Sequence, residues 1–476
     1  MKKSIFLPRW RLPLILLAFL LACNLPTPDS APEPTMPAPT AAPTSAPPAP
    51  PPTAVPTFPA AATQPAGSQN ASRWIDTTSG IHVFNDQLAT VMSDAQWQFS
   101  ATRYAGTQKM PRPQAERLRA INPNFFILHY RLGLGLGYRA IENGCQPSGE
   151  WLAIVVGEDW VQEWPGDENV QEEWFYHQPQ DSTTRILNCD WGWYLADLDN
   201  PSWRDYWQTT VLSQVQANAA DGVFMDSLSV PNYMGADRFV PPLPEVDESF
   251  ETAWSQRITD WLSWLQTQPL GDYAIVPNVG SWINGRDITD YSPADGVMVE
   301  GFAIEADQSP YTLEDWKLQM NRILDWTAQE KAMIGQTYVY GDQERMFALG
   351  SYLLVKGSRS YLNIELDLMP EWYPEYDIPI GAALTPPPTN IDELYDSISG
   401  AYRREFDNAF IFVNPTNPWD GSGETLTIDL GAEYPLAVTH GGGEIAEDGS
   451  TSGTLEYQQV RTITLPPFSA AVLLRQ

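Results

Sequence analysis

One short pattern occurs twice in the chain and constrains the fold more than any other feature. Residues 221–226 read Asp-Gly-Val-Phe-Met-Asp, and residues 295–300 read Asp-Gly-Val-Met-Val-Glu. In both copies a turn that ends in Gly leads into a short apolar run, which a carboxylic acid closes. An apolar run too short for a helix is typical of a strand that is buried on both faces of a parallel sheet. The pattern therefore predicts two such strands, with Asp226 and Glu300 at their C-terminal ends.

Strand-like runs and amphipathic helices alternate between about residues 72 and 398, which is typical of a parallel α/β fold. Eight strands are expected, at residues 81–84, 97–104, 125–129, 222–226, 274–278, 296–300, 333–338 and 360–364. Helices are expected at residues 112–120, from 200 onward, and at 247–266, 312–329 and 342–355. This alternation predicts a (β/α)8 TIM barrel. An open doubly wound sheet is the alternative, but it would not require polar residues at nearly every C-terminal strand end.

Two regions depart from this alternation. Residues from about 140 to 199 form an insertion that is rich in Trp, and after residue 399 the chain consists of short strands separated by turn clusters. The expected short strands include residues 425–430, 435–438, 454–457 and 460–465. Residues 399–476 are therefore expected to form a small all-β sandwich, an accessory domain that follows the barrel.

The N-terminus is expected to be a processing segment rather than part of the fold. A basic start precedes an apolar segment at residues 14–22, which is too short to span a bilayer. Leu20-Leu21-Ala22-Cys23 resembles a bacterial lipobox. This resemblance implies that residues 1–22 are removed and that Cys23 carries a lipid. A signal peptide with an incidental Cys is the alternative.

Residues 23–71 are rich in Pro, Ala and Thr, so they cannot bury a core and are expected to be a disordered linker. The expected product is a lipoprotein of the bacterial cell envelope that faces the extracytoplasmic side. Once Cys23 is assigned, Cys145 and Cys189 remain. An even pair in an exported protein suggests one disulfide, and free buried thiols are the alternative.

The chain is strongly acidic, with 27 Lys and Arg against 59 Asp and Glu and a formal net charge of −32. Such a surface repels phosphate backbones, so no nucleic-acid partner is expected. The Gly residues of 133–137 lack the spacing of the dinucleotide fingerprint, and the four His residues lack zinc-site spacing. No cofactor or metal is therefore expected. Many of the 19 Trp and 20 Tyr residues must be core, but flat aromatic faces also pack against sugar rings. We expect a monomer with a carbohydrate substrate.

Polar residues follow or close most of the predicted barrel strands. A ring of such residues at one rim predicts a polar substrate site. Asp197 precedes the Asn200-Pro201 helix start and could reach this rim, although stabilisation of the helix N-terminus explains it equally well. The candidate substrate-binding residues are Asn85, Asp86, Gln108, Arg131, Asp197, Asn278, Gln336, Tyr338 and Glu365.

Asp226 and Glu300 stand apart because each directly closes an apolar strand. One strand separates their two strands, so the backbones are expected to lie ~9–10 Å apart. Side chains that lean inward could place the carboxyl groups about 5–6 Å apart, which suits a retaining glycosidase. We expect Asp226 to be the nucleophile and Glu300 the general acid and base. The alternative is that both acids cap neighbouring helices.

Several stretches resemble the hypothetical glycosyl hydrolase family 15, a set of TIM-barrel glycosidases. They are Asp-Gly-Val-Phe-Met-Asp, Val-Pro-Asn at 276–278, Asp-Gly-Val-Met-Val-Glu-Gly-Phe, and Trp-Tyr-Pro-Glu-Tyr-Asp at 372–377. The resemblance covers residues from about 75 to 475 and implies a barrel glycosidase.

The arrangement is also similar to the α-galactosidase clan, which implies a nucleophile after strand four and an acid/base after strand six, at Asp226 and Glu300. Glu instead of Asp after strand six leaves the stereochemistry open. A lipoprotein that binds carbohydrate or has a structural role in the envelope, and has lost activity, is the alternative function.

Overall fold

The structure is a computed structural model that describes residues 74–142, 145–148, 154–156, 161–166, 168–179, 181–268, 270–305, 307–364 and 369–475. The chain divides into two compact units, Met1–Pro65 and Ala66–Gln476, and all described residues belong to the second. The expected signal peptide, the lipid-bearing Cys23, the linker and the candidate site residue Glu365 lie outside the described residues. No helix within the described ranges is long and apolar enough to cross a membrane.

The second unit is built around a barrel of eight parallel strands, as the sequence predicted. In chain order they are β1 (Val83–Gln87), β2 (Tyr104–Gln108), β3 (Phe126–Leu132), β11 (Gly222–Asp226), β13 (Ala274–Pro277), β14 (Gly296–Glu300), β15 (Ala332–Thr337) and β16 (Ser360–Ile364). From β1 to β13 and from β14 to β16, each strand pairs with the next in the sequence, and β16 pairs with β1. The barrel closes between β13 and β14, where Asn278 bridges to Met298 and the Asp295 N–H donates to the Ile275 carbonyl at 2.9 Å.

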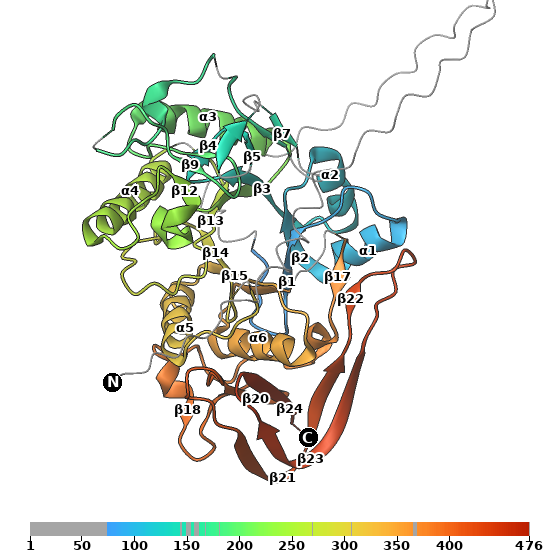
Figure 1. Ribbon diagram of the computed structural model, residues 1–476. Coiled ribbons are helices and arrows are strands. Elements are labelled where there is room, and N and C mark those ends of the chain that lie inside the picture. The colour runs from blue at the N-terminus through green and yellow to red at the C-terminus, as the bar shows by residue number, and fades with distance from the viewer. Residues whose placement is uncertain are drawn as a thin grey trace, which may run out of the picture. The chain divides into compact units, whose positions relative to one another are not determined.

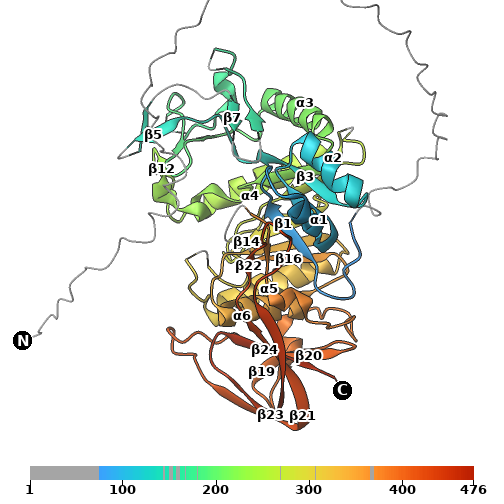
Figure 2. The ribbon, with the colours of Figure 1, turned by 90° about the vertical axis from the view of Figure 1, so that its right-hand side faces the viewer.

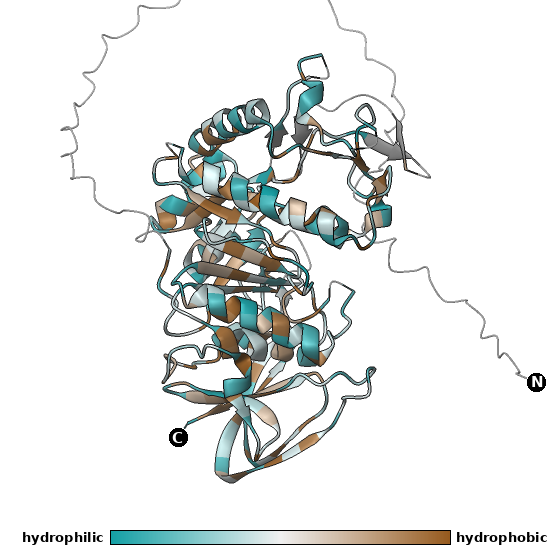
Figure 3. Cartoon of the chain, turned by 90° about the vertical axis from the view of Figure 1, so that its left-hand side faces the viewer, coloured by the Kyte–Doolittle hydropathy of each residue, from teal (hydrophilic) through white to brown (hydrophobic). Residues whose placement is uncertain are grey.

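The α-helices of the described residues lie outside the ring of strands (Figure 1). They are α1 (Asp94–Arg103), α2 (Arg112–Ile121), α3 (Pro201–Ala217), α4 (Glu248–Gln266), α5 (Leu313–Thr327) and α6 (Asp342–Val355). The helices carry both hydrophilic and hydrophobic bands (Figure 3), as expected for helices with one face on the barrel and one in solvent.

The second predicted strand, at residues 97–104, is wrong. Residues 94–103 form helix α1, and β2 begins only at Tyr104. Ser93 and Gln96 form a reciprocal capping box, which satisfies backbone N–H groups at the helix start. Trp97 and Ala101, one helical turn apart, are both buried. This helical spacing explains why the apolar residues of 97–104 do not form a strand.

The repeated Asp-Gly pattern acts at the N-terminal end of the barrel. The carboxylate of Asp221 accepts the Ile127 N–H of β3 at 2.8 Å, and Asp295 accepts the Ile275 N–H of β13 at 2.8 Å. A Cβ atom at Gly222 would lie 2.3 Å from a backbone oxygen of β13, so a residue without a side chain is required there. Each copy therefore holds its strand in register with the strand before it.

Trp74 closes the N-terminal mouth of the barrel. Its ring is buried, and its centroid lies 4.2 Å from that of Phe126 and 5.7 Å from that of Tyr361, near the starts of β3 and β16. The Tyr361 hydroxyl donates to the Ile75 carbonyl at 2.8 Å, which holds the entering chain in place. Polar residues at the opposite ends of the strands are therefore approached from the C-terminal mouth.

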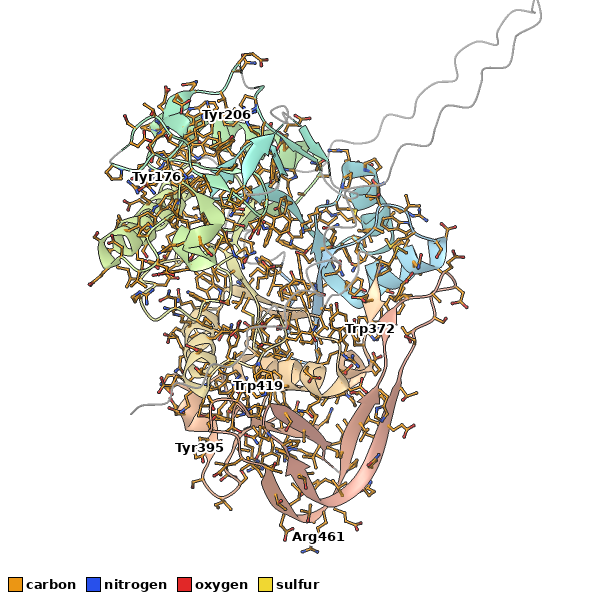
Figure 4. The ribbon with its side chains drawn as sticks, in the orientation of Figure 1. Tyr176, Tyr206, Trp372, Tyr395, Trp419 and Arg461 are labelled. Atoms are coloured by element: carbon orange, nitrogen blue, oxygen red, sulfur yellow. A yellow bond between two sulfur atoms is a disulfide. The ribbon has the colours of Figure 1, made fainter. Side chains whose placement is uncertain are left out.

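The insertion between β3 and α3 packs into the same apolar core as the helices around the barrel. Its short strands are β4 (Gly135–Leu136), β5 (Ala140–Glu142), β6 (Gln146–Ser148), β7 (Ile154–Val156), β8 (Val161–Glu163), β9 (Leu187–Asn188) and β10 (Tyr194–Leu195). The predicted disulfide between Cys145 and Cys189 is present, with a Cα–Cα distance of 5.2 Å. Trp174 stacks on Tyr206 of α3 with ring centroids 4.6 Å apart. Tyr206 is labelled on α3 in Figure 4. Aromatic residues of this region thus contribute to a core.

The C-terminal strands form one antiparallel sheet in the order β18 (Tyr395–Asp396), β19 (Ala401–Glu405), β20 (Ala409–Asn414), β24 (Ser469–Leu474), β21 (Leu426–His440) and β23 (Thr454–Leu465). Residues 425–430 and 435–438, expected as two strands, belong to the single long β21, and β23 likewise joins 454–457 and 460–465. The sheet lies against α6 (Figure 2). Helix α6 covers one face of the sheet, and the opposite face buries an apolar cluster of its own between its strands, which includes Phe410, Phe412, Ile428 and Leu473.

Candidate active site

The two acids of the repeated pattern lie at the C-terminal rim of the barrel. Asp226 is the last residue of β11 and Glu300 the last of β14, and both are half-buried. The residues two positions before these acids, Phe224 and Met298, belong to the apolar cluster inside the barrel. Asp226 and Glu300 therefore share the inward-facing side of their strands. Alternation of side chains therefore directs both carboxyl groups toward the barrel axis.

Asn278 joins the two acids. It directly follows β13, the strand between β11 and β14. Its side-chain nitrogen donates to Asp226 Oδ1 at 2.9 Å and to Glu300 Oε2 at 2.6 Å, so these two oxygens are at most about 5.5 Å apart. The Gly280 N–H donates to Asn278 Oδ1 at 3.0 Å. This contact orients the amide so that both N–H groups face the acids.

Two tyrosines complete the hydrogen bonding of the pair. The Tyr130 hydroxyl donates to Asp226 Oδ2 at 2.6 Å, and the Tyr338 hydroxyl donates to Glu300 Oε1 at 2.8 Å. The Ser227 N–H also donates to Asp226 Oδ1, at 2.7 Å. Asp226 therefore receives three donors, which stabilise negative charge on its carboxylate.

Burial and the negative charge of Asp226 raise the pKa of Glu300 above its usual range, although the donors Asn278 and Tyr338 oppose the shift. Burial, followed by the charge of Asp226, also raises the pKa of Tyr130 well above its ordinary value. Tyr130 therefore stays protonated and remains a donor to Asp226. A raised pKa on one of two neighbouring carboxyl groups is the arrangement that lets one acid hold a proton while the other is ionised.

A second polar group lies beside the pair, at the ends of β1 and β2. The Lys109 ammonium lies 2.9 Å from Asp86 Oδ2, and Gln108 also donates to Asp86. The same ammonium lies 5.0 Å from the ring centroid of Tyr130. The negative charge of Asp86 contributes to the raised pKa of Glu300, so it acts on the same site.

Gln336 and Asn363 extend the polar rim on β15 and β16. Asn363 donates to the side-chain oxygen of Gln336 at 2.8 Å, and both residues are buried. Of the residues expected at the rim, the structure thus places Asp86, Gln108, Asn278, Gln336 and Tyr338 on the strands that surround the acid pair or directly after them.

Three other expected site residues lie elsewhere. Arg131 follows the inward-facing Tyr130, so its side chain faces outward, where the guanidinium lies 3.8 Å over the Trp164 ring. Asp197 accepts the Asp199 N–H at 3.3 Å ahead of α3, and burial raises its pKa. Asn85 is buried and accepts the Thr107 hydroxyl at 3.4 Å.

Sequence reasoning missed two residues of the site, Tyr130 and Lys109. Tyr130 shares the strand face of Phe126 and Leu128, and all three pack in or against the cluster inside the barrel. Side-chain alternation along β3 indicates that Tyr130, and not Arg131, faces the inside of the barrel. Lys109 lies beyond the end of β2, where no strand periodicity applies. Among the described residues, no group of three or more His, Cys, Asp or Glu side chains is arranged to hold a metal ion.

Comparison with known proteins identifies a family. The profile of the hypothetical glycosyl hydrolase family 15 matches residues 119–410. A search of curated proteins finds no match.

Among solved structures, the α-amylase of Geobacillus thermoleovorans in complex with acarbose is 10% identical, with a TM-score of 0.36, over 84% of this chain and 99% of that one. The Paenibacillus sp. cycloisomaltooligosaccharide glucanotransferase, in complex with cycloisomaltoheptaose, is 10% identical with a TM-score of 0.34, over 84% and 56%. The Nostoc punctiforme debranching enzyme is 11% identical with a TM-score of 0.34, over 84% and 99%.

The raised pKa of Glu300 predicts that its ionised form lowers the stability of the folded protein. The folded protein binds this proton more tightly than the unfolded chain, so the stability contribution of Glu300 falls as pH rises from its unfolded pKa through its folded pKa. Glu300→Gln removes the charge, so its melting temperature should exceed that of the wild type by roughly 1–3 °C at pH 7.5. The gain should disappear near pH 4. Differential scanning calorimetry across this range measures both.

Glu116→Gln is the control, because Glu116 is exposed on α2 and pairs with Arg112 at the surface. It should show no comparable gain at neutral pH. A Glu300→Gln protein that is less stable than the wild type at pH 7.5 would contradict the account of the pair.

Proposed function

Because the chain belongs to the hypothetical glycosyl hydrolase family 15, we propose that it hydrolyses glycosidic bonds of extracellular polysaccharide or oligosaccharide with two carboxyl groups. The observation that carries the proposal is the shared donor Asn278, which limits the nearest oxygens of Asp226 and Glu300 to about 5.5 Å. Retaining glycosidases have carboxyl separations of about 5–5.5 Å, whereas inverting enzymes need about 6.5–9.5 Å to admit a water.

In the proposed mechanism Asp226 attacks the anomeric carbon while Glu300 protonates the departing glycosidic oxygen. A covalent bond forms between Asp226 and the sugar, and the bond to the leaving group breaks. Glu300, now ionised, then removes a proton from water, and this water releases the sugar from Asp226. The stereochemistry at the anomeric carbon is retained after these two displacements.

The polar neighbours have separate tasks in this mechanism. Tyr130 and Asn278 donate to different oxygens of Asp226 and hold the carboxylate in a fixed orientation. Tyr338 donates to Glu300 Oε1, whereas Asn278 donates to Oε2 of the same carboxyl group. Burial and the charge of Asp226 raise the pKa of Glu300, which favours the protonated form that the first step requires. When Asp226 becomes an ester, its charge disappears and Glu300 ionises more easily for the second step.

Variants of the two acids test these roles. Glu300→Gln should slow hydrolysis of natural oligosaccharides ~10²–10⁴-fold, because positioned proton transfer contributes about that much. The loss should shrink on aryl glycosides with good leaving groups, which depart without a proton. Asp226→Asn should abolish turnover of both kinds of substrate, because it cannot form the covalent intermediate.

Asp197→Asn is the matched control, because Asp197 lies in the segment ahead of α3 and accepts the Asp199 N–H; it should keep nearly full activity. NMR of the first product should show the anomeric configuration of the substrate. Near wild-type turnover by Asp226→Asn would exclude this mechanism and favour a carbohydrate-binding role. A reversed leaving-group pattern would exchange the roles of the two acids.

We further propose that the protein is anchored by a lipid on Cys23 and works outside the cytoplasm. The disulfide between Cys145 and Cys189 supports an oxidising compartment. Mass spectrometry of the membrane fraction should find a mature chain that begins at a diacylated Cys23. Cys23→Ser should abolish the modification and the processing. An intact segment from Met1 to Ala22 in the wild-type protein would contradict the anchor.

A further inference from the structure

Lys109 has a backbone conformation that is unfavourable for a residue with a side chain. It directly follows β2 and has a φ of 60°, in the left-handed region where Gly is the usual residue. Non-Gly residues in such conformations cluster at functional sites. A Gly would suit this backbone better, so the contribution of Lys109 must come from its side chain.

The Lys109 side chain ends beside the acid pair. Its ammonium lies 2.9 Å from Asp86 Oδ2 and 5.0 Å from the ring centroid of Tyr130, whose hydroxyl donates to Asp226. The ion pair is therefore separated from Asp226 by about one aromatic ring, a span comparable to that of one pyranose. The side chains of Lys109 and Asp86 are 14% and 16% exposed, so neither is sealed in the core.

The charges around Lys109 select the kind of sugar that fits. Among the described residues, Asp86 pairs with the ammonium, and the charges of Asp86 and Asp226 both act on Glu300. A sugar carboxylate here would face the negative charges of Asp86 and Asp226 with one cation, which is unfavourable. Two neighbouring hydroxyls of a neutral sugar suit the pair, because one can accept from the ammonium while the other donates to the carboxylate.

We propose that Lys109 and Asp86 form a subsite that binds two adjacent hydroxyl groups of a neutral sugar whose anomeric carbon lies at Asp226. This inference rests on the proposed hydrolysis at the acid pair and adds the class of sugar. It makes Lys109 a substrate-binding residue rather than a structural one, and it excludes uronic acids from this position.

The experiment compares wild-type protein with Lys109→Met, Lys109→Gly and Lys109→Arg on p-nitrophenyl glycosides of glucose, galactose, mannose and glucuronic acid, in both anomeric forms. At least one neutral glycoside should be hydrolysed, and the glucuronides should not. Lys109→Met and Lys109→Gly should lower kcat/KM about tenfold to a hundredfold, as expected for a lost hydrogen bond to a charged group. Lys109→Arg should restore part of the loss.

Two controls separate binding from structure. Lys317→Met removes a Lys that pairs with Asp392 at the surface, at 2.7 Å. Glu330→Gly replaces a residue with a φ of 57° in the connection from α5 to β15, away from the acid pair. Both should leave kcat/KM unchanged. Lys109→Gly should fold as well as Glu330→Gly. With folding preserved, its loss of activity comes from the missing side chain.

Wild-type kcat/KM in Lys109→Met and Lys109→Gly would overturn the subsite while leaving the proposed hydrolysis intact. A preference for glucuronides would overturn it as well. If wild-type protein hydrolyses none of these glycosides, calorimetric titration with free glucose, galactose and mannose decides the matter separately. Binding that Lys109→Met weakens would support the subsite, and the absence of binding to folded wild-type protein would overturn it.

Discussion

One amide group, the side-chain NH2 of Asn278, bonds to two carboxyl groups at once, and the proposed chemistry depends on this contact. Two carboxylates that are partly removed from water repel each other, so such a pair is unfavourable unless one holds a proton or donors stabilise both. Asn278 supplies one donor to Asp226 and one to Glu300. Tyr130 and Tyr338 supply one more to each acid. The site is therefore fully hydrogen-bonded before a substrate arrives.

The opposite end of the barrel fixes the positions from which these side chains project. Asp221 and Asp295 each accept a backbone N–H from the preceding strand, and a shift by one residue would break these contacts. Such a shift would also turn every side chain of the strand to the other face. The two acids of each repeat therefore act together. The first acid fixes the register of its strand, and this register places the second acid on the inward side of the C-terminal rim.

Much of the barrel could be predicted from the sequence because buried parallel strands appear as short apolar runs. The acid pair followed from the same runs, since each acid closes one. The sequence does not separate helix from strand at residues 97–104, because their apolar residues fit a strand as well as the helix that Ser93 caps. The sequence marks the end of β3 but not its inward face, so it favours Arg131, whose side chain faces outward, over Tyr130. The left-handed conformation of Lys109 depends on the surrounding structure and has no signal in the sequence.

The central claim is that Asp226 becomes covalently bonded to the sugar, and trapping that bond tests it most directly. A 2-deoxy-2-fluoro glycosyl fluoride of a sugar that the protein accepts slows the second step, so the glycosyl enzyme should accumulate. Intact-protein mass spectrometry should then show the mass of one glycosyl unit, and peptide mapping should place it on Asp226. Asp226→Asn should remain unmodified. An adduct on Glu300, or turnover of the natural substrate without any adduct under these conditions, would contradict the account.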